Sequence, residues 1–381
     1  MKFSSEFRDP GKARSILGAI ERLVADIDLP KGRPLQIMEV CGGHTHSVFR
    51  YGLQRLVPRE IEFVHGPGCP VCVLPKGRID DCIALAQIPD MILTTFGDAM
   101  RVPGSRKSLL QAQAEGADVR MVYSPLDALD LARRNPDREV VFFGLGFETT
   151  MPSTALTILE AERDGIDNYS MLCQHITIIP PLRALLADPD TLIDGFIGPG
   201  HVSMVIGVRG YDFIAAEHGK PMVVAGFEPL DILQALWMVL KHLAHGRAEV
   251  ENQYVRVVPE RGNPVALAAM EKVFEPRAET QWRGLGQIDG SGAQIRAEYA
   301  TFDAERKFGL VSADVPDPAL CKCGEVVKGH LKPWQCPAFG KECTPATPLG
   351  ALMVSSEGAC AAYQQYAAPR QRAELRKSSC A

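Results

Sequence analysis

His65-Gly66-Pro67-Gly68-Cys69-Pro70-Val71-Cys72 is the stretch that decides how this 381-residue chain folds. It follows a short apolar run, residues 61–64, that is typical of a β-strand, and it precedes a helical pattern. A second segment, Cys41-Gly42-Gly43-His44-Thr45-His46, stands in the same position after residues 35–40. Ligands bind at the carboxyl ends of parallel strands, because loops and helix N-termini converge there. We therefore expect three thiols and two imidazoles to meet in one crevice.

The alternation of strand and helix patterns continues well beyond these two loops. Eight apolar runs have the character of strands, with helical periodicity in most of the gaps: residues 35–40, 61–64, 91–96, 119–123, 139–144, 169–173, 193–197 and 222–225. Unbroken runs such as Val140-Val141-Phe142-Phe143 are typical of strands that are buried on both faces. The sequence therefore predicts an α/β fold with parallel sheets.

Two short sequence motifs that each occur twice predict two such α/β units. Gly66-Pro67-Gly68 recurs as Gly198-Pro199-Gly200, and Gly146-Phe147-Glu148 recurs as Gly226-Phe227-Glu228, although chance repetition in a chain rich in Gly and Pro competes with this interpretation. We expect units at residues 1–125 and 126–245. Residues 246–381 form a third part, in which Cys, Pro and Gly dominate from Cys321 onward. So loop-rich a segment needs a cross-link or a bound metal to stabilise it, and its cysteines are the candidates to provide one.

Composition narrows the classes of function. Hydrophobic residues make up 46% and charged residues 23%, and a net charge of −5 with interspersed signs indicates neither a nucleic-acid nor an acidic-membrane partner. The N-terminus lacks an apolar signal core, and no run is long enough for a membrane span, so we expect a cytoplasmic protein. In that compartment, eleven cysteines indicate metal ligands or redox thiols rather than structural disulfides.

Three cysteines carry the candidate chemistry of the two loops. Cys69 and Cys72 form a Cys-x-x-Cys pair, which supports dithiol/disulfide chemistry, supplies half of a metal site, or has no function. The positive end of a following helix would lower the pKa of such thiols. Cys41 adds a third thiol with His44 beside it, and these donors suit Zn or low-valent Fe. The alternative is that Cys41 is a small buried residue and that the histidines cap a helix.

Polar side chains follow other predicted strands in the same way. Asp98, Glu148, His201 and Glu228 occupy this position. The three carboxyl groups act as acids or bases or orient a ligand imidazole, and helix capping is the competing role. A hydrolase or transferase built on Asp98, Glu148 and His201 is disfavoured, because the sequence has no Gly-x-Ser-x-Gly motif. It has no Walker-type phosphate loop either, so any nucleotide use must come from elsewhere.

The C-terminal part offers four thiolates for one metal site. These are Cys323, Cys336, Cys343 and Cys360. They suit a [4Fe–4S] cluster and a tetrahedral zinc site equally well, because their spacing matches neither ferredoxins nor zinc ribbons. On an extended chain Cys321 would point away from Cys323, so we interpret it as a spare thiol or an electron relay.

Seven ordered segments resemble those of the HypD family of [NiFe]-hydrogenase maturation factors. They are residues 41–46, 66–72, 95–98, 146–150, 198–203, 226–229 and 353–363. The resemblance extends from about residue 35 to residue 363 and depends on several independent motifs. It implies two Rossmann-like α/β units that face a cleft, and a third, loop-rich part that binds a [4Fe–4S] cluster.

The resemblance also implies a function. Members of this family are scaffolds on which the Fe(CN)₂CO unit of the hydrogenase active site is assembled, in complex with the small chaperone HypC. HypE supplies the cyanide ligands to that complex, and the hydrogenase large subunit is served indirectly. Such a scaffold has redox activity without being a conventional enzyme that acts on a small substrate.

Residue roles follow from the matched positions. The resemblance makes Cys41 the iron-contacting cysteine, with His44 beside it, and makes Cys69 and Cys72 a redox-active pair that iron binding also requires. It assigns four cysteines to the cluster, which favours iron–sulfur over zinc: Cys323, Cys336, Cys343 and Cys360. The alternative function is a stand-alone thiol–disulfide oxidoreductase with a structural C-terminal metal site.

Overall fold

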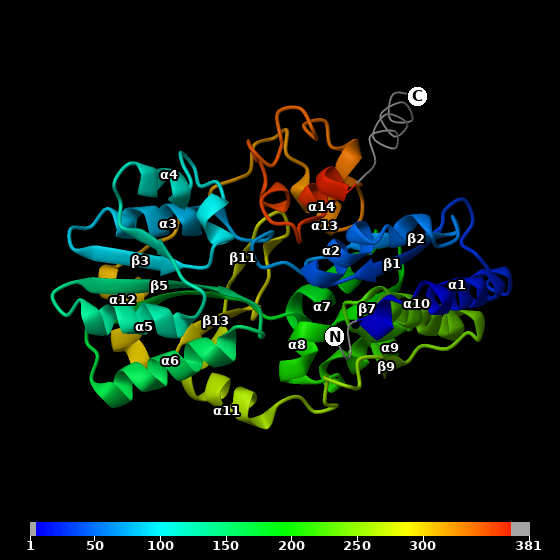
Figure 1. The fold of residues 1–381 in the computed structure, drawn as a ribbon, viewed down its shortest axis with the longest axis horizontal. Helices are drawn as coiled ribbons and strands as arrows, with labels where there is room; N and C mark the ends of the chain where they lie inside the picture. Colours follow the sequence, from blue (N-terminus) through cyan, green and yellow to red (C-terminus); the bar gives the residue numbers. More distant parts are fainter. Residues whose placement is uncertain (1–4, 367–381) are drawn as a thin grey trace.

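Two parallel β-sheets form the body of the chain, as seen in a computed structural model that describes residues 5–366 (Figure 1). Sheet A has five strands in the order β2 (Ile61–His65), β1 (Leu35–Glu39), β7 (Ile193–Pro199), β8 (Met222–Ala225) and β9 (Val250–Asn252). Sheet B has four strands in the order β4 (Val119–Met121), β3 (Met91–Thr95), β5 (Glu139–Gly146) and β6 (Tyr169–His175). Every neighbouring pair in both sheets is parallel.

The prediction of an α/β fold with parallel sheets is confirmed. Each of the eight predicted strands begins at the predicted residue and ends within two residues of the predicted end. The reason is visible in β5, where Val140, Val141, Phe142 and Phe143 are all fully buried. A strand covered on both faces needs an unbroken apolar run, and such a run is easy to recognise in a sequence.

Helices cover both faces of each sheet. Around sheet A lie α1 (Pro10–Ala25), α2 (Gly42–Arg50), α7 (Ile179–Ala187), α8 (Gly200–Ile206), α9 (Asp212–His218) and α10 (Pro229–Ala244). Around sheet B lie α3 (Lys76–Ala86), α4 (Leu109–Ala114), α5 (Pro125–Arg134), α6 (Met151–Asp164), α11 (Pro264–Val273) and α12 (Ala304–Phe308). The 3-10 helices are η1 (Ser5–Arg8), η2 (Leu53–Arg55), η3 (Ala99–Arg101), η4 (Arg209–Tyr211), η5 (Ala297–Phe302), η6 (Pro333–Gln335) and η7 (Ala351–Met353).

The apolar cores identify the layers. In sheet A, α1 and α10 pack on one face and α7 and α9 on the other. In sheet B, α3 and α4 pack on one face and α5 and α6 on the other (Figure 1). Asp9 caps α1 by accepting a hydrogen bond from the backbone N of Lys12 at 2.8 Å, and Pro10 is the first residue of this helix. None of the helices formed by residues 5–366 is long and apolar enough to cross a membrane.

Sheet membership differs from the predicted division at residue 125. Sheet A takes its strands from residues 35–65 and 193–252, whereas sheet B takes residues 91–175. The chain therefore leaves sheet A after β2 and returns to it at β7. The two repeated motifs behave differently: Gly66-Pro67-Gly68 and Gly198-Pro199-Gly200 both stand at the ends of sheet A strands, whereas Gly146-Phe147-Glu148 stands at the end of β5 in sheet B and Gly226-Phe227-Glu228 at the end of β8 in sheet A. Strand pairing is a long-range property, and local periodicity does not encode it.

The segment after β9 wraps around sheet B and then becomes loop-rich. It contains two short antiparallel pairs, β10 (Phe274–Arg277) with β13 (Gly292–Ile295) and β11 (Gln281–Trp282) with β12 (Gly286–Gln287). Beyond them lie α13 (Cys323–Val327) and α14 (Ala359–Tyr366). Helix α14 packs against α2, so this part of the chain sits over the carboxyl edge of sheet A (Figure 1).

Candidate functional site

The Cys41 loop and the Cys69–Cys72 loop rest on each other at the carboxyl edge of sheet A. The backbone N of Gly42 donates a hydrogen bond to the carbonyl oxygen of Gly68 at 3.2 Å. A Cβ on Gly68 would overlap the backbone of Val40 and Cys41. Glycine at this position is therefore required for the close approach of the two loops.

A cavity of about 410 Å³ opens beside these loops. Its lining comes from three parts of the chain and includes Cys41 and Pro70 from the sheet A loops, Phe147 and Thr149 after β5 of sheet B, His201 of α8, and Glu357 before α14. All of these residues except Glu357 follow the carboxyl ends of parallel strands, where the strand pattern predicts a ligand site.

The thiol of Cys41 is buried and stays protonated in the absence of a cation. Burial raises the pKa of Cys41, and the nearby carboxyl groups of Glu357 and Glu39 raise it further. The backbone N of Cys41 donates to Oε2 of Glu39 at 3.0 Å, which fixes the start of α2. A metal ion that replaces the proton would bind a thiolate held in a set position.

The Cys69–Cys72 pair is more enclosed than the sequence predicts. The two residues are only 4% and 3% exposed. Burial, together with the neighbouring thiol of Cys69, raises the pKa of Cys72, and Cys323 adds to this effect. The expectation of a pKa lowered by a helix dipole is wrong for Cys72, because residues 70–73 form a turn and α3 begins only at Lys76. Cys69 and Cys72 belong to the same packed core as the C-terminal cysteines Cys323, Cys343 and Cys360.

Five cysteines line one small cavity in the C-terminal part: Cys321, Cys323, Cys336, Cys343 and Cys360. Burial raises the pKa of Cys343, and the backbone N of Leu349, which points at its sulfur at 3.4 Å, partly offsets that effect. The sulfurs of Cys321 and Cys323 lie 3.3 Å apart, so Cys321 faces the same cavity, contrary to the expectation that it points away. The four predicted ligands therefore fit a centre that is held by four thiolates.

His44 and His201 stack on opposite sides of one aromatic ring. Their ring centroids lie 4.7 and 3.9 Å from that of Phe227. Nε2 of His44 donates to the carbonyl oxygens of Ala225 and Gly226, at 3.2 and 3.0 Å, so this ring points toward the end of β8. Burial lowers the pKa of both histidines, which keeps them neutral. Of the two, it is His201 that lines the cavity.

Comparison with known proteins agrees with this geometry. The family model described as "HypD: Hydrogenase formation hypA family" matches residues 12–367. The chain belongs to the HypD family. It is 62% identical over 374 residues to the hydrogenase maturation factor HypD of Rhodobacter capsulatus, an alignment that covers 97% of this chain and 99% of that protein. It is 54% identical over 366 residues to HypD of Escherichia coli (strain K12), with 96% and 98% covered. The predicted resemblance is confirmed.

Asp98 and Glu148 of this HypD-family chain do not line the cavity: Asp98 is exposed, and Glu148 is buried between two residues that do line it, Phe147 and Thr149. Oδ2 of Asp98 accepts a hydrogen bond from Oγ of Ser355 at 3.0 Å, which ties the loop after β3 to the segment before α14. Glu148 is 3% exposed, and its Oε1 accepts from the backbone N of Ile178 at 3.1 Å. Its Oε2 has no hydrogen-bond partner among the described residues. Burial raises the pKa of Glu148 to about 7, so this carboxyl group holds a proton near neutral pH.

The sequence analysis missed Glu39, the carboxyl group that organises the Cys41 loop. Glu39 is 1% exposed and accepts hydrogen bonds from Oγ1 of Thr45 and from the backbone N of Cys41. It also lies 2.7 Å from Nδ1 of His65, at the end of the neighbouring strand. The available signal was an acidic residue inside an apolar strand pattern, a combination that is rare without a partner.

Glu357 was also missed, although its motif contributed to the resemblance. Glu357 lines the cavity of about 410 Å³ beside Cys41, called the thiol cavity below. It packs against Gly42, where an added Cβ would overlap the Glu357 side chain. Burial, Asp98 and Glu39 raise the pKa of Glu357. It also contributes to the raised pKa of both Cys41 and Cys72. Glu357 and Cys41 thus line the same cavity.

Proposed function

We propose that this HypD-family chain acts in hydrogenase maturation as the scaffold on which the Fe(CN)₂CO unit of a [NiFe]-hydrogenase is assembled. It acts together with a small HypC-type chaperone, a HypE-type protein supplies the cyanide, and the hydrogenase large subunit is served indirectly. Membership of the family supports the maturation role. The observation that carries the scaffold role is the cavity of about 410 Å³, lined by Cys41, at the contact between the two cysteine loops.

Cys41 holds the iron cargo together with a thiolate of the partner chaperone. Cyanide and CO are strong-field ligands, and soft thiolate donors suit the low-valent iron that carries them. Binding of iron displaces the thiol proton of Cys41, and the carboxyl group of Glu357 lies where it can take that proton. The cavity volume of about 410 Å³ leaves room for diatomic ligands.

Cys69 and Cys72 supply electrons to this site. Oxidation of the dithiol forms one S–S bond and releases two electrons and two protons. When bound at Cys323, Cys336, Cys343 and Cys360, a [4Fe–4S] cluster supplies one-electron transfer. The electrostatic influence of Cys323 on Cys72 supports a short path between the two sets of thiols.

A stand-alone thiol–disulfide oxidoreductase is disfavoured by burial. Exchange with a protein disulfide requires an accessible thiolate. Cys69 and Cys72 are almost fully buried, and the pKa of Cys72 is raised. These properties suit a pair that exchanges electrons inside the protein rather than with a substrate in solution.

The test is a Cys41→Ala variant, purified anaerobically with the small chaperone. We expect it to lose the mononuclear iron and the infrared bands of bound CN and CO, while the C-terminal iron and sulfide stay. Cys82→Ala is the matched control, because Cys82 is a fully buried cysteine of α3 outside the cavity. A Cys41→Ala variant that keeps both bands would contradict the proposal. Turnover of a generic disulfide by the isolated chain would favour the oxidoreductase instead.

A further inference from the structure

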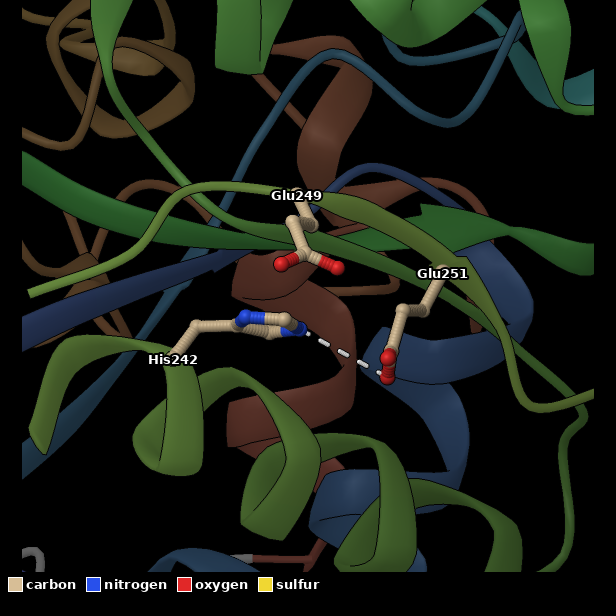
Figure 2. Close-up of side chains that lie close together, drawn as sticks. All are labelled: His242, Glu249 and Glu251. Carbon is tan, nitrogen blue, oxygen red and sulfur yellow. Dashed lines mark ion pairs between the residues drawn. The ribbon is translucent and has the colours of Figure 1, made fainter. Parts of the chain in front are cut away.

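A second group of possible metal ligands lies at the other end of α10 from the thiol cavity. His242, Glu249 and Glu251 come together there (Figure 2). Phe227, which packs on His201 of the cavity, lies just before Pro229, the first residue of α10. His242 stands 13 residues after Pro229, which places the group ~20 Å along the helix axis. It is thus separate from all of the cysteines discussed above.

The fold brings the two carboxylates to the same face. Glu249 and Glu251 flank Val250, the first residue of β9, and alternate residues of a strand project to one side. Glu251 is paired with Val223 of β8, and Val223 belongs to the apolar core under α10. Both carboxylates therefore face α10, and His242 in its last turn faces them.

The ring of His242 lies close to both carboxylates and makes few hydrogen bonds of its own. One ligand atom from each of the three residues lies within 4.8 Å of the other two. Nε2 of His242 points at Oε2 of Glu251 across 3.5 Å, longer than a normal hydrogen bond (Figure 2). The residue is 3% exposed, and its Nδ1 has no hydrogen-bond partner among the described residues. A buried imidazole that uses so little of its bonding capacity is unfavourable by itself.

We propose that His242, Glu249 and Glu251 bind a divalent first-row transition-metal ion such as Mn²⁺, Fe²⁺ or Zn²⁺. One imidazole and two carboxylates supply borderline and hard donors, and their two negative charges match a dication. Water completes the coordination. The ion joins β9, an edge strand of sheet A, to the last turn of α10. This inference is independent of the proposed scaffold function, because no cysteine takes part in it.

Another role for the carboxylates is the protection of an edge strand. Charged side chains on such strands discourage pairing with a second chain. That role requires neither a buried imidazole nor the convergence of three ligand atoms. Nearby, the guanidinium of Arg247 lies 3.8 Å from Glu249, but both side chains are half exposed and free to separate. The buried ring of His242 thus favours the metal site over edge protection.

The test is a titration of the full-length protein with Mn²⁺, in which electron paramagnetic resonance measures the free ion. Mn²⁺ prefers oxygen and nitrogen donors, so the cysteines compete little for it. We expect one saturable site per chain, weakened at least about tenfold in Glu251→Gln and in Glu249→Gln. Glu260→Gln is the matched control, since Glu260 is a similarly exposed carboxylate with its own arginine partner, Arg209. It should bind Mn²⁺ as the unmodified protein does.

Hydrogen exchange of the Val250–Asn252 amides provides a second measurement. Mn²⁺ should slow their exchange in the unmodified protein and in Glu260→Gln, but not in Glu251→Gln. Absence of saturable Mn²⁺ binding would overturn the proposal. Equal binding by Glu251→Gln and the unmodified protein would overturn it as well. Neither result would count against the proposed function of the cysteines, because that function is tested separately by the infrared bands of bound CN and CO.

Discussion

The two cysteine-lined cavities of this chain are built in different ways. Cys41, which lines the first cavity, lies directly after β1, and Cys69 and Cys72 lie in the loop after the neighbouring strand β2, so the pairing of parallel strands fixes where these loops begin. Around Cys323, the thiols come from loops and from two short helices, α13 and α14, of five and eight residues. Regular hydrogen bonding supports the first cavity, whereas the second depends on the contacts of its own side chains.

In the function proposed above, this difference would separate a site for cargo from a site for a resident group. Thiols held by a sheet keep their positions whether or not a metal ion is bound, so iron can enter and leave without unfolding. Thiols that hold several loops together through a shared ligand contribute to the stability of those loops. Loss of that ligand therefore destabilises this part of the chain. The comparison therefore predicts unequal effects of substitutions in the two cavities, and three experiments test it from the largest expected effect to the smallest.

The largest effect is expected from Cys343→Ser in the C-terminal cavity. Loss of one of four ligands should destabilise this part of the chain by roughly 3–5 kcal/mol. Hydrogen exchange should therefore accelerate across residues 320–366 while the strands of sheet B keep their protection. Mössbauer spectra of the anaerobic protein would follow the loss of the [4Fe–4S] signal. Stoichiometric zinc and no such signal in the unmodified protein would contradict the cluster assignment, and unchanged exchange would remove the contrast between the cavities.

A smaller effect is expected from Gly68→Ala at the contact of the two cysteine loops. The added Cβ would overlap the backbone of Cys41, which cannot move without disturbing β1 and α2. We expect a loss of about 3 kcal/mol in the free energy of unfolding, measured by denaturant titration, together with weaker iron binding. Gly18→Ala in α1 is the control, because its nearest neighbour is the flexible end of Arg22, at 3.7 Å, and alanine favours a helix. Equal stability of the two variants would show that the loops do not need their close contact.

Features that depend on local sequence could be predicted, whereas features that depend on distant contacts could not. Strand positions were predictable, because burial on both faces requires unbroken apolar runs such as Val140–Phe143. Sheet membership was not, because the pairing of β1 with β7 joins residues far apart in the chain. The candidate ligands were visible as residue types, but Glu39 was not, since its role exists only once His65 and Thr45 are brought to it. Likewise, burial reverses the pKa shift expected for Cys72, and spacing alone does not encode burial.

The smallest of the three effects is expected from Glu148, whose neighbours Phe147 and Thr149 line the thiol cavity. Its pKa rises from 4.5 to about 7 on folding, because burial disfavours the charged form. Between these two values the folded state binds more protons than the unfolded state, so stability falls as pH rises through this window. The destabilisation is complete above pH 7 and absent below the unfolded value. Glu148→Gln mimics the protonated carboxyl group and should remove this pH dependence.

At pH 8 we expect the Glu148→Gln variant to be more stable than the unmodified protein by about 2 kcal/mol, and to equal it near pH 4. Denaturant titrations across this range provide the measurement. The matched control is Glu260→Gln, an exposed carboxylate whose substitution should leave the slope unchanged. If Glu148→Gln keeps the full pH dependence, the carboxyl group of Glu148 is already ionised in the folded protein. It must then be stabilised by a positive charge in addition to its hydrogen bond from the backbone N of Ile178. The wall of the thiol cavity would then be adapted to a fixed negative charge rather than to a proton.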